Sequence, residues 1–406
     1  MKIAVICNLP PPFGGAEVFA KELALHVSMA GIDLFVVAQK LFEIQLNENS
    51  SVLEYPYQPE QQRDFIAQNV RIYPFFITSF KKERKKGIDE HAIETLEKLF
   101  SLEKPDLVHC HFTTTKAQEV LHVCRRFNIP SIITLHGMTN LVPLHDSYEC
   151  VGMTAKRTVY LLRFYTHVVV VSSQMSAYCN RNGLHNVTYI SNGIDTEFFS
   201  LTKHNNPKGI LYVGKCNSHK GLKESIRAFL NIENDITENL HLVGRGINRN
   251  TFDIMGFFLC EQERKKTAKL IDRGRICLLG ELSQFDLRRL YRTSKVLVLP
   301  SLTEGFPLVI LEALASGTPV IASDVGEISK VVRHGENGYI IPKGDSDLLG
   351  KAILKICTEC QYELHKVCRN SVRDYNIHRT AAEYTNLFED ILKKGTKYDQ
   401  NCGYIR

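Results

Sequence analysis

The sequence predicts an α/β protein with two Rossmann-like domains, each built around a parallel β-sheet. Short, nearly continuous apolar runs alternate with helical patterns along the chain, and such runs are typical of parallel strands that helices cover on both faces. The alternation stops at the polar, Asn-rich segment 202–208 and then resumes. The chain has 406 residues, which is long enough for two domains of ordinary size.

The first half of the chain contains six apolar runs that we expect to form strands. Residues 17–30, between the first two runs, have a helical pattern, and Gly31 follows them. Glycine commonly lies just past the C-terminus of a helix. The six expected strands are 3–7, 34–37, 107–111, 132–135, 168–171 and 187–190.

The second half repeats this pattern and ends in a long helix, expected over residues 379–393. Its expected strands are 210–213, 240–243, 276–279, 296–299, 320–322 and 339–341. We therefore expect an N-terminal Rossmann-like domain over 1–200, a C-terminal one over 201–378, and a final helix and tail over 379–406.

The composition argues against several classes of protein. The net charge of +6 is modest and spread along the chain, so it does not indicate nucleic-acid binding. No apolar run reaches the ~18 residues of a membrane span, and the apolar start is too short for a signal peptide. Twelve cysteines without regular spacing indicate a reducing compartment. We expect a cytoplasmic protein, with peripheral binding to the cytoplasmic membrane face as an option.

The stretch 297–323 is the part of the sequence that most clearly predicts a binding site. It has the pattern of a strand, a loop, a buried helix and a second strand. We expect Pro307 at the first helical position, where its missing N–H costs nothing. The N–H groups of Leu308, Val309 and Ile310 are then free to bind a phosphate.

Two carboxylates accompany this helix start. Glu312 lies inside the apolar helix, and we expect it to bind both ribose hydroxyls of a nucleotide whose diphosphate sits at the helix start. Glu304, on the loop, is expected to bind hydroxyls of a sugar beyond that diphosphate. The alternatives are a solvent-facing Glu312 and an ordinary loop acid at Glu304. The first alternative is disfavoured, because an unpaired carboxylate in apolar surroundings is costly.

Glu304 and Glu312, with seven residues between them, resemble the E-x7-E motif of retaining glycosyltransferases of family four (glycosyl transferases group 1), which have the GT-B fold. Pro300-Ser301, Gly305-Phe306 and Gly317-Thr-Pro-Val-Ile321 fit the same pattern. The resemblance implies two domains facing across a cleft, with acceptor on the first, nucleotide sugar on the second, and the final helix packing back on the first.

The resemblance also implies the reaction, which is retaining transfer of a sugar from a nucleotide diphosphate sugar to a hydroxyl acceptor. The expected setting is glycan, glycolipid or polysaccharide synthesis. By family frequency, a UDP-sugar is the preferred donor and a GDP-sugar is the next.

Glycines and lysines follow the first expected strand of each domain. Gly14 and Gly15 open the first helix, where glycines let N–H groups approach a phosphate; an ordinary turn is the alternative. Lys215 and Lys220 follow strand 210–213 and are expected to clamp a diphosphate; two solvated lysines are the alternative. The resemblance implies the same roles, although the family has Arg where this chain has Lys215.

His136 follows the expected strand 132–135, and a histidine at a strand's carboxyl end faces a ligand more often than the core. The resemblance implies that His136 contacts the transferred sugar near the reacting carbon. His109 and His111 are interpreted as core or rim groups. At residues 326–330 a Pro and a Glu of the family pattern are missing, so no function is assigned there.

Residues 75–86 are apolar and then basic. One interpretation places this segment on an anionic membrane surface, and the slightly favoured one is a helix with a solvated basic face. The basic residues are Lys81, Lys82, Arg84, Lys85 and Lys86.

Cys357, Cys360, His365 and Cys368 have spacings that resemble a zinc site. The three cysteines also fall on one face of a helix expected to run from about residue 347. Buried thiols on such a face are the commoner outcome, so we favour a structural role.

We therefore expect three catalytic residues, His136, Lys220 and Glu304. The expected donor-binding residues are Gly14, Gly15, Lys215, Lys220, Glu304, Phe306, Pro307, Leu308, Val309 and Glu312. No cofactor or metal is expected, because the chain has no Asp-x-Asp pair in a cleft loop. The rival hypotheses are a GT-B sugar epimerase and a non-catalytic nucleotide-sugar-binding protein.

Overall fold

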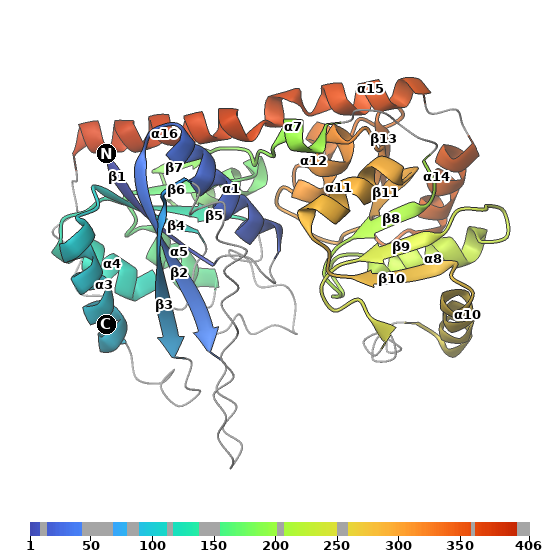
Figure 1. The fold of residues 1–406 in the computed structure, drawn as a ribbon, viewed down its shortest axis with the longest axis horizontal. Coiled ribbons are helices and arrows are strands. Elements are labelled where there is room, and N and C mark those ends of the chain that lie inside the picture. The colour runs from blue at the N-terminus through green and yellow to red at the C-terminus, as the bar shows by residue number, and fades with distance from the viewer. Residues whose placement is uncertain are drawn as a thin grey trace, which may run out of the picture. The chain divides into compact units, whose positions relative to one another are not determined.

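The structure is a computed structural model in which the chain forms two compact units (Figure 1). It describes residues 1–8, 14–42, 68–78, 89–111, 117–137, 155–200, 207–249, 259–358 and 362–395. Unit 1 comprises 1–191 and 378–406, and unit 2 comprises 192–377. The boundaries expected from the sequence lie at 200/201 and 378/379.

Unit 1 contains a seven-stranded parallel sheet with the order β3-β2-β1-β4-β5-β6-β7. Helix α1 covers one face, and α3 and α4 cover the other. The central strands are buried along nearly their whole length, which explains their continuous apolar sequence. The bounds are β1 Lys2–Cys7, α1 Gly15–Met29, β2 Asp33–Phe42, β3 Arg71–Thr78, α3 Glu90–Glu103, β4 Leu107–His111, α4 Ala117–Arg126, β5 Ser131–Leu135, α5 Ala155–Leu162, β6 His167–Val170, α6 Ser173–Arg181 and β7 Val187–Tyr189.

Unit 2 contains a six-stranded parallel sheet with the order β10-β9-β8-β11-β12-β13. Its strands carry the same buried, β-branched sequences. The bounds are α7 Thr196–Phe199, β8 Ile210–Val213, α8 Leu222–Ile232, β9 Leu240–Val243, α10 Glu261–Asp272, β10 Ile276–Gly280, α11 Gln284–Thr293, β11 Val296–Leu299, α12 Leu308–Ala315, β12 Val320–Ser323, α13 Ile328–Val331, β13 Gly338–Ile341, α14 Ser346–Thr358, α15 Tyr362–Ser371 and η5 Arg373–Tyr375. Two parallel sheets with helices confirm the predicted fold class.

The final helix, α16, spans Ile377–Lys394, and from His378 onward it belongs to unit 1. Its Tyr384 is fully buried, and the Tyr384 hydroxyl lies 3.0 Å from Oγ1 of Thr134 on β5. The Phe388 ring packs edge-on against His109 of β4, with 5.4 Å between ring centroids. The last apolar face of the chain therefore completes the core of unit 1.

The interpretation of residues 75–86 as a basic-faced helix is wrong for its first part. Residues 75–78 are the end of strand β3, which pairs with β2 alone and so forms the edge of the sheet. Pro74 lies within this strand, and proline is tolerated in an edge strand, where its missing N–H leaves no ladder bond unmade. The basic residues at 81–86 lie outside the described residues.

The prediction that Cys357 and Cys368 lie on one face of a single helix is also wrong. The two residues lie on two different helices. Cys357 is on α14, which packs on α8, whereas Cys368 is on α15, which packs on α12. Burial raises the pKa of both thiols, that of Cys357 to about 12. Cys360 is outside the described residues, among which no group of three metal-binding side chains is found.

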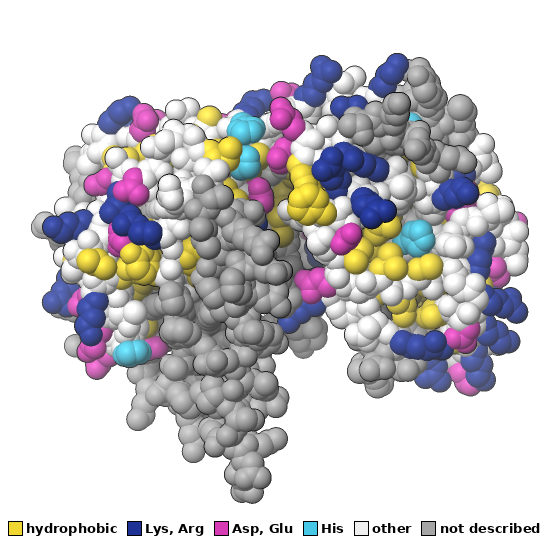
Figure 2. Space-filling model, in the orientation of Figure 1, with side chains coloured by type: hydrophobic (Ala, Val, Ile, Leu, Met, Phe, Trp, Pro, Cys, Tyr) yellow, Lys and Arg dark blue, Asp and Glu magenta, His cyan; other side chains and the backbone are white. Residues whose placement is uncertain are grey.

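Figure 2 shows one face of the molecule, on which basic and acidic side chains are interspersed and hydrophobic side chains form small groups. This distribution agrees with the modest net charge. Within the part of the chain that the structure describes, no helix is both long and apolar enough to cross a membrane.

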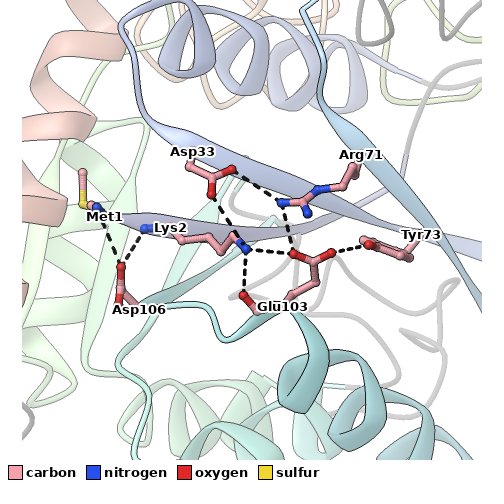
Figure 3. A network of polar contacts seen from close by, with 7 residues as sticks. All are labelled: Met1, Lys2, Asp33, Arg71, Tyr73, Glu103 and Asp106. Atoms are coloured by element: carbon pink, nitrogen blue, oxygen red, sulfur yellow. Dashed lines mark hydrogen bonds and ion pairs between the residues drawn. The ribbon is translucent and has the colours of Figure 1, made fainter.

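A buried carboxylate holds together the amino-terminal edge of the unit 1 sheet (Figure 3). Glu103, at the end of α3, has a side chain only 4% exposed. It lies 3.0 Å from Lys2 Nζ and 3.1 Å from Arg71 Nη2, and it accepts a hydrogen bond from the Tyr73 hydroxyl. Burial raises the pKa of Glu103, but the hydrogen bonds from Tyr73 and Lys2 and the charge of Arg71 outweigh it and hold the pKa below its usual value.

We expect Glu103→Gln to destabilise unit 1 by about 3 kcal/mol at pH 7, the order seen when one member of a buried ion pair is removed. Because the pKa of Glu103 is lower in the folded state, its stabilisation is present above its unfolded pKa and is lost as pH falls through the folded pKa. The difference in Tm between variant and wild type should therefore shrink below about pH 4.

The matched control is Glu97→Gln on the same helix, whose partner Arg126 is 65% exposed. Exposed pairs contribute about 1 kcal/mol or less, so this variant should stay close to wild type. Equal melting curves for the two variants at pH 7 would refute the role given to Glu103.

Candidate functional site

The predicted donor-binding residues of unit 2 gather where the strand order of its sheet reverses. The chain passes from β8 to β9 and β10 on one side and then places β11 on the other side of β8. In open parallel sheets, ligands bind at the carboxyl ends of strands at this switch point. The loops that follow β8 and β11 carry Lys220 and Glu304 respectively.

The two loops are fixed to each other through their backbones. The N–H of Leu302 donates to the carbonyl of His219 at 2.8 Å. Gly221 has a φ of +72°, and a Cβ there would lie 2.1 Å from the carbonyl oxygen of Pro300. Only glycine fits this left-handed backbone at such a close approach, so the glycine after Lys220 holds the lysine loop against the glutamate loop.

Lys220 and Glu304 form a bidentate ion pair across these loops. Lys220 Nζ lies 2.7 Å from each carboxylate oxygen of Glu304, and Ser301 Oγ donates to Oε1 at 2.8 Å. The Glu304 side chain is 6% exposed and that of Lys220 is 29% exposed. Glu304 therefore lies beside a positive charge, and Lys220 is not the freely solvated surface lysine of the alternative interpretation.

Helix α12 begins directly after this loop. The structure corrects the position of Pro307, which is the N-cap, with extended backbone, while Leu308 is the first helical residue. The Ile310 N–H was expected to be free for a phosphate, and this is wrong. It donates to the Pro307 carbonyl at 3.3 Å. The N–H groups of Leu308 and Val309 stay at the positive end of the helix, as an anion-binding site requires.

Glu312 is buried on α12, with 6% exposure, so its alternative as a solvent-facing residue is wrong. Its Oε2 accepts a hydrogen bond of 2.8 Å from the hydroxyl of Tyr291, a fully buried residue of α11. Burial and the nearby Glu312 raise the pKa of Tyr291 well above its ordinary value. Tyr291 therefore remains a protonated donor that fixes the direction of the Glu312 carboxylate.

The segment between Glu304 and α12 is supported from two sides. The buried Asn192 donates from Nδ2 to the carbonyl of Phe306 at 2.9 Å, and the Glu327 N–H donates to the carbonyl of Gly305 at 3.1 Å. Gly326 has a φ of +61°, and a Cβ there would lie 2.4 Å from the Gly305 oxygen. Residues 326–327, where this chain departs from the family pattern, thus support the loop of Glu304 through their backbone.

Gly14 and Gly15 lie at the start of α1, at the carboxyl end of β1 in unit 1. Gly14 is the N-cap, and its N–H donates to Oε2 of Glu17 at 2.8 Å. Gly15 is exposed at the first helical position. Glu17 therefore caps the helix and occupies the N–H of Gly14. Gly15 is the exposed residue at this helix start.

His136 follows β5 and belongs to a cluster of three histidines in unit 1. His111, the last residue of β4, lies with Nδ1 3.1 Å from Nε2 of His136. His109, two residues earlier, is buried beneath them, with its ring centroid 4.3 Å from that of His111. Burial lowers the pKa of His136 to about 3, so this side chain is neutral at pH 7.

The structure pairs Lys220 with Glu304, and it places Phe306, Leu308 and Glu312 on the segment that runs from Glu304 into α12. Their roles in donor binding remain predictions. Lys215 is exposed, and it makes no ion pair with the residues that the structure describes. The supporting contacts that Tyr291, Asn192, Ser301 and His111 make were not predicted from the sequence. Tyr291, Asn192 and His111 have partners on another element or loop, so their sequence neighbours carry no sign of the contact. Ser301 and Glu304 lie on the same loop, where no regular periodicity predicts which side chains meet.

Two family descriptions match the chain, one for each half. The description "Glycosyltransferase Family 4" matches residues 13–198, and "Glycosyl transferases group 1" matches residues 193–374. An uncharacterized glycosyltransferase of Methanocaldococcus jannaschii is 25% identical over 420 residues, covering 97% of this chain and 99% of the relative. A UDP-Gal:alpha-D-GlcNAc-diphosphoundecaprenol alpha-1,3-galactosyltransferase of Escherichia coli is 24% identical over 375 residues, covering 88% and 93%.

Solved structures agree with the family match. Sucrose-phosphate synthase from Thermosynechococcus elongatus aligns with a TM-score of 0.72 at 21% identity, over 97% of this chain and all of that one. The Anabaena protein HepE in complex with UDP and glucose also reaches 0.72, at 17% identity, over 96% and 100%. These likenesses establish the GT-B fold. Since the two family descriptions together span residues 13 to 374 and the fold agrees, the chain belongs to the group 1, family four glycosyltransferases.

Proposed function

We propose that this glycosyltransferase moves a sugar from a nucleotide diphosphate sugar, preferably a UDP-sugar, to a hydroxyl acceptor, with retention of anomeric configuration and without a metal. The observation that carries the proposal is the Lys220–Glu304 pair at the switch point of the unit 2 sheet, next to the start of α12. It combines a cation for a diphosphate with a carboxylate for sugar hydroxyls.

The geometry of unit 2 suggests how the donor binds. The diphosphate takes hydrogen bonds from the Leu308 and Val309 amides, while Lys220 neutralises the charge of the departing nucleotide. Glu312, directed by the hydroxyl of Tyr291, accepts hydrogen bonds from the ribose. Glu304 accepts hydrogen bonds from the transferred sugar, and the ion pair with Lys220 holds its carboxylate in place.

In unit 1, Gly14, Gly15 and His136 keep the roles that the family resemblance implies. The resemblance then gives the exposed amide of Gly15 to the diphosphate and His136 to the transferred sugar. Since burial keeps His136 neutral and Glu304 is paired with Lys220, neither group is available as a charged acid or as a nucleophile. A phosphate oxygen of the leaving nucleotide then accepts the proton of the acceptor hydroxyl.

The names of similar proteins support this donor and the class of acceptor. The Escherichia coli relative is named for UDP-Gal and a diphosphoundecaprenol acceptor, and a Mycobacterium leprae relative, 27% identical over 195 residues, is a phosphatidyl-myo-inositol mannosyltransferase. The Anabaena structure holds UDP and glucose. A lipid-linked sugar is therefore the first acceptor class to test.

We expect an α-linked donor to give an α-linked product. Donors are first ranked by the rise in Tm that each nucleotide sugar causes, since a ligand of the native state raises its stability. The best donor is then incubated with candidate acceptors, and proton NMR of the first product gives the anomeric configuration. A β-linked product would overturn the mechanism, and an isomerised sugar without acceptor transfer would indicate an epimerase. Binding without turnover for every acceptor would indicate a non-catalytic binder.

We also expect full activity in excess chelator. In this proposal, Lys220 and the start of α12 meet the charge of the diphosphate, so a divalent ion is not needed. The measurement is the rate of nucleotide release with and without chelator. Loss of activity that magnesium or manganese restores would show that a metal carries this charge instead.

A further inference from the structure

A second group of basic side chains lies in unit 2, beside the end of α12 that is farther from the proposed donor site. Helix α12 has eight residues and is therefore about 12 Å long. Beyond its C-terminus, Ser316 Oγ donates to the carbonyl of Phe199 at 3.1 Å, and the Thr318 hydroxyl donates to the carbonyl of Tyr291. Helices α7 and α11 therefore meet at this end of α12, and α15 packs on the same helix.

Three arginines form this group, which we call the arginine cluster: Arg288 and Arg292 of α11, and Arg369 of α15. Arg288 and Arg292 are four positions apart, so they are neighbours on the surface of α11, and like charges at this spacing destabilise a helix. Burial, and then the positive charges of Arg288 and Arg369, lower the pKa of Arg292. Among the described residues, none of the three arginines forms an ion pair with a carboxylate. The cluster is therefore a concentration of positive charge that this part of the chain leaves unneutralised.

Two of the guanidinium groups are held in place by uncharged partners. Cζ of Arg288 lies over the face of the Phe198 ring, 4.8 Å from its centroid, and Phe285 packs edge-on against Phe198 with 5.2 Å between centroids. Arg292 donates from Nη2 to the carbonyl of Ser200. An aromatic ring and a carbonyl oxygen fix the direction of a guanidinium without cancelling its charge. The two side chains are therefore oriented and remain cationic.

Hydrogen-bond donors are also left over in the arginine cluster. The Nε atoms of Arg288 and Arg292 are both buried, and neither has a hydrogen-bond partner among the described residues. Buried N–H groups without a partner are rare in proteins, and each one left unsatisfied destabilises the folded state. Unneutralised positive charge and unsatisfied donors at one place both indicate a site for an anion that accepts hydrogen bonds.

We propose that the arginine cluster is a binding site for a phosphate group, separate from the donor site at the start of α12. Guanidinium groups bind phosphate through pairs of parallel N–H donors, and a phosphate supplies the negative charge that the three arginines lack. The phosphate comes from solution or from a lipid headgroup. Phe285, which is 69% exposed beside the cluster, suits the apolar part of a lipid, and Figure 2 shows basic side chains next to a hydrophobic group over α11.

Inorganic phosphate is the first probe, and its affinity is taken from the rise in Tm that it causes relative to chloride at equal ionic strength. We expect Arg292→Gln to bind phosphate at least ~10-fold more weakly than wild type, the effect of losing a charged hydrogen bond. The matched control is Arg289→Gln, an exposed position on the same helix, which should respond as wild type does. Lys220→Ala removes the cation of the proposed donor site and should keep most of the response.

Cations near the C-terminus of a helix also stabilise that helix. If this is the whole role of the cluster, Arg292→Gln lowers the Tm without phosphate and responds to phosphate as wild type does, which would overturn the proposal. Arg369→Gln is a second variant at an exposed position, so it tests the site even if Arg292→Gln does not fold. We expect its phosphate affinity to fall as well.

Vesicles distinguish the two sources of the phosphate. The full chain is sedimented with vesicles of phosphatidylcholine, with and without phosphatidic acid, as wild type, Arg292→Gln and Phe285→Ser. A lipid headgroup is the source if both substitutions weaken binding to the acidic vesicles while Phe285→Ser keeps the response to inorganic phosphate. Free phosphate is the source if only the response to inorganic phosphate depends on Arg292. If neither probe depends on Arg292 or Arg369, the cluster is not a phosphate site. No measurement here uses sugar transfer, so the result does not depend on the proposed function.

Discussion

Lys220→Ala is expected to lower kcat for sugar transfer by at least ~10²-fold, the scale seen when a preorganised charge stabiliser is removed from an active site. Negative charge develops on the diphosphate as the sugar departs, and Lys220 is the cation that the structure fixes at the switch point of the unit 2 sheet. The loss should fall mainly on kcat, because the charge is greatest in the transition state. Initial rates of nucleotide release at saturating donor measure it.

The matched control is Lys215→Ala in the same loop. Lys215 is exposed, and a flexible exposed lysine is not preorganised. Its substitution should therefore lower kcat less than that of Lys220. Since Lys220→Ala also leaves the 6% exposed Glu304 side chain without its cation, the Tm of both variants is measured and the assays are run well below it. A folded Lys220→Ala variant with wild-type kcat would show that Lys220 has only a surface role.

Glu304→Ala and Glu312→Ala are expected to damage different kinetic parameters. In the proposed function Glu312 binds the ribose, which is held equally in the ground and transition states. Loss of Glu312 should therefore weaken nucleotide binding by about 10- to 100-fold and change kcat less. The proposed function places Glu304 nearer the reacting centre, so its loss should lower kcat more than it raises KM. Calorimetric titration with the free nucleotide and steady-state kinetics with the donor distinguish the two.

Tyr291→Phe provides the control for Glu312. It removes the hydroxyl that directs Glu312 and keeps the ring, so it should weaken nucleotide binding in the same direction but by less. Equal nucleotide affinity in Glu312→Ala and wild type would refute the ribose assignment. If Glu304→Ala changed KM alone, Glu304 would act in ground-state binding only.

Much of the fold and part of the site could be predicted from the sequence. The buried strands of both sheets are continuous apolar runs, so local composition indicates them directly. Strand β3 was missed because Pro74 interrupts it, and the break between α14 and α15 was missed because one helical pattern continues across it. Local periodicity does not show which strand forms the edge of a sheet, or where one helix ends and the next begins.

The sequence by itself determined the two-sheet fold class and the spacing of Glu304 and Glu312, because both depend on residues close together in the chain. The tertiary structure alone decided the partners of these groups. Lys220 meets Glu304 across 84 positions, and Tyr291 meets Glu312 across 21. These pairings exist because β8 lies beside β11 and α11 packs on α12. Contacts of this kind follow from the order of strands in a sheet, which no local pattern specifies.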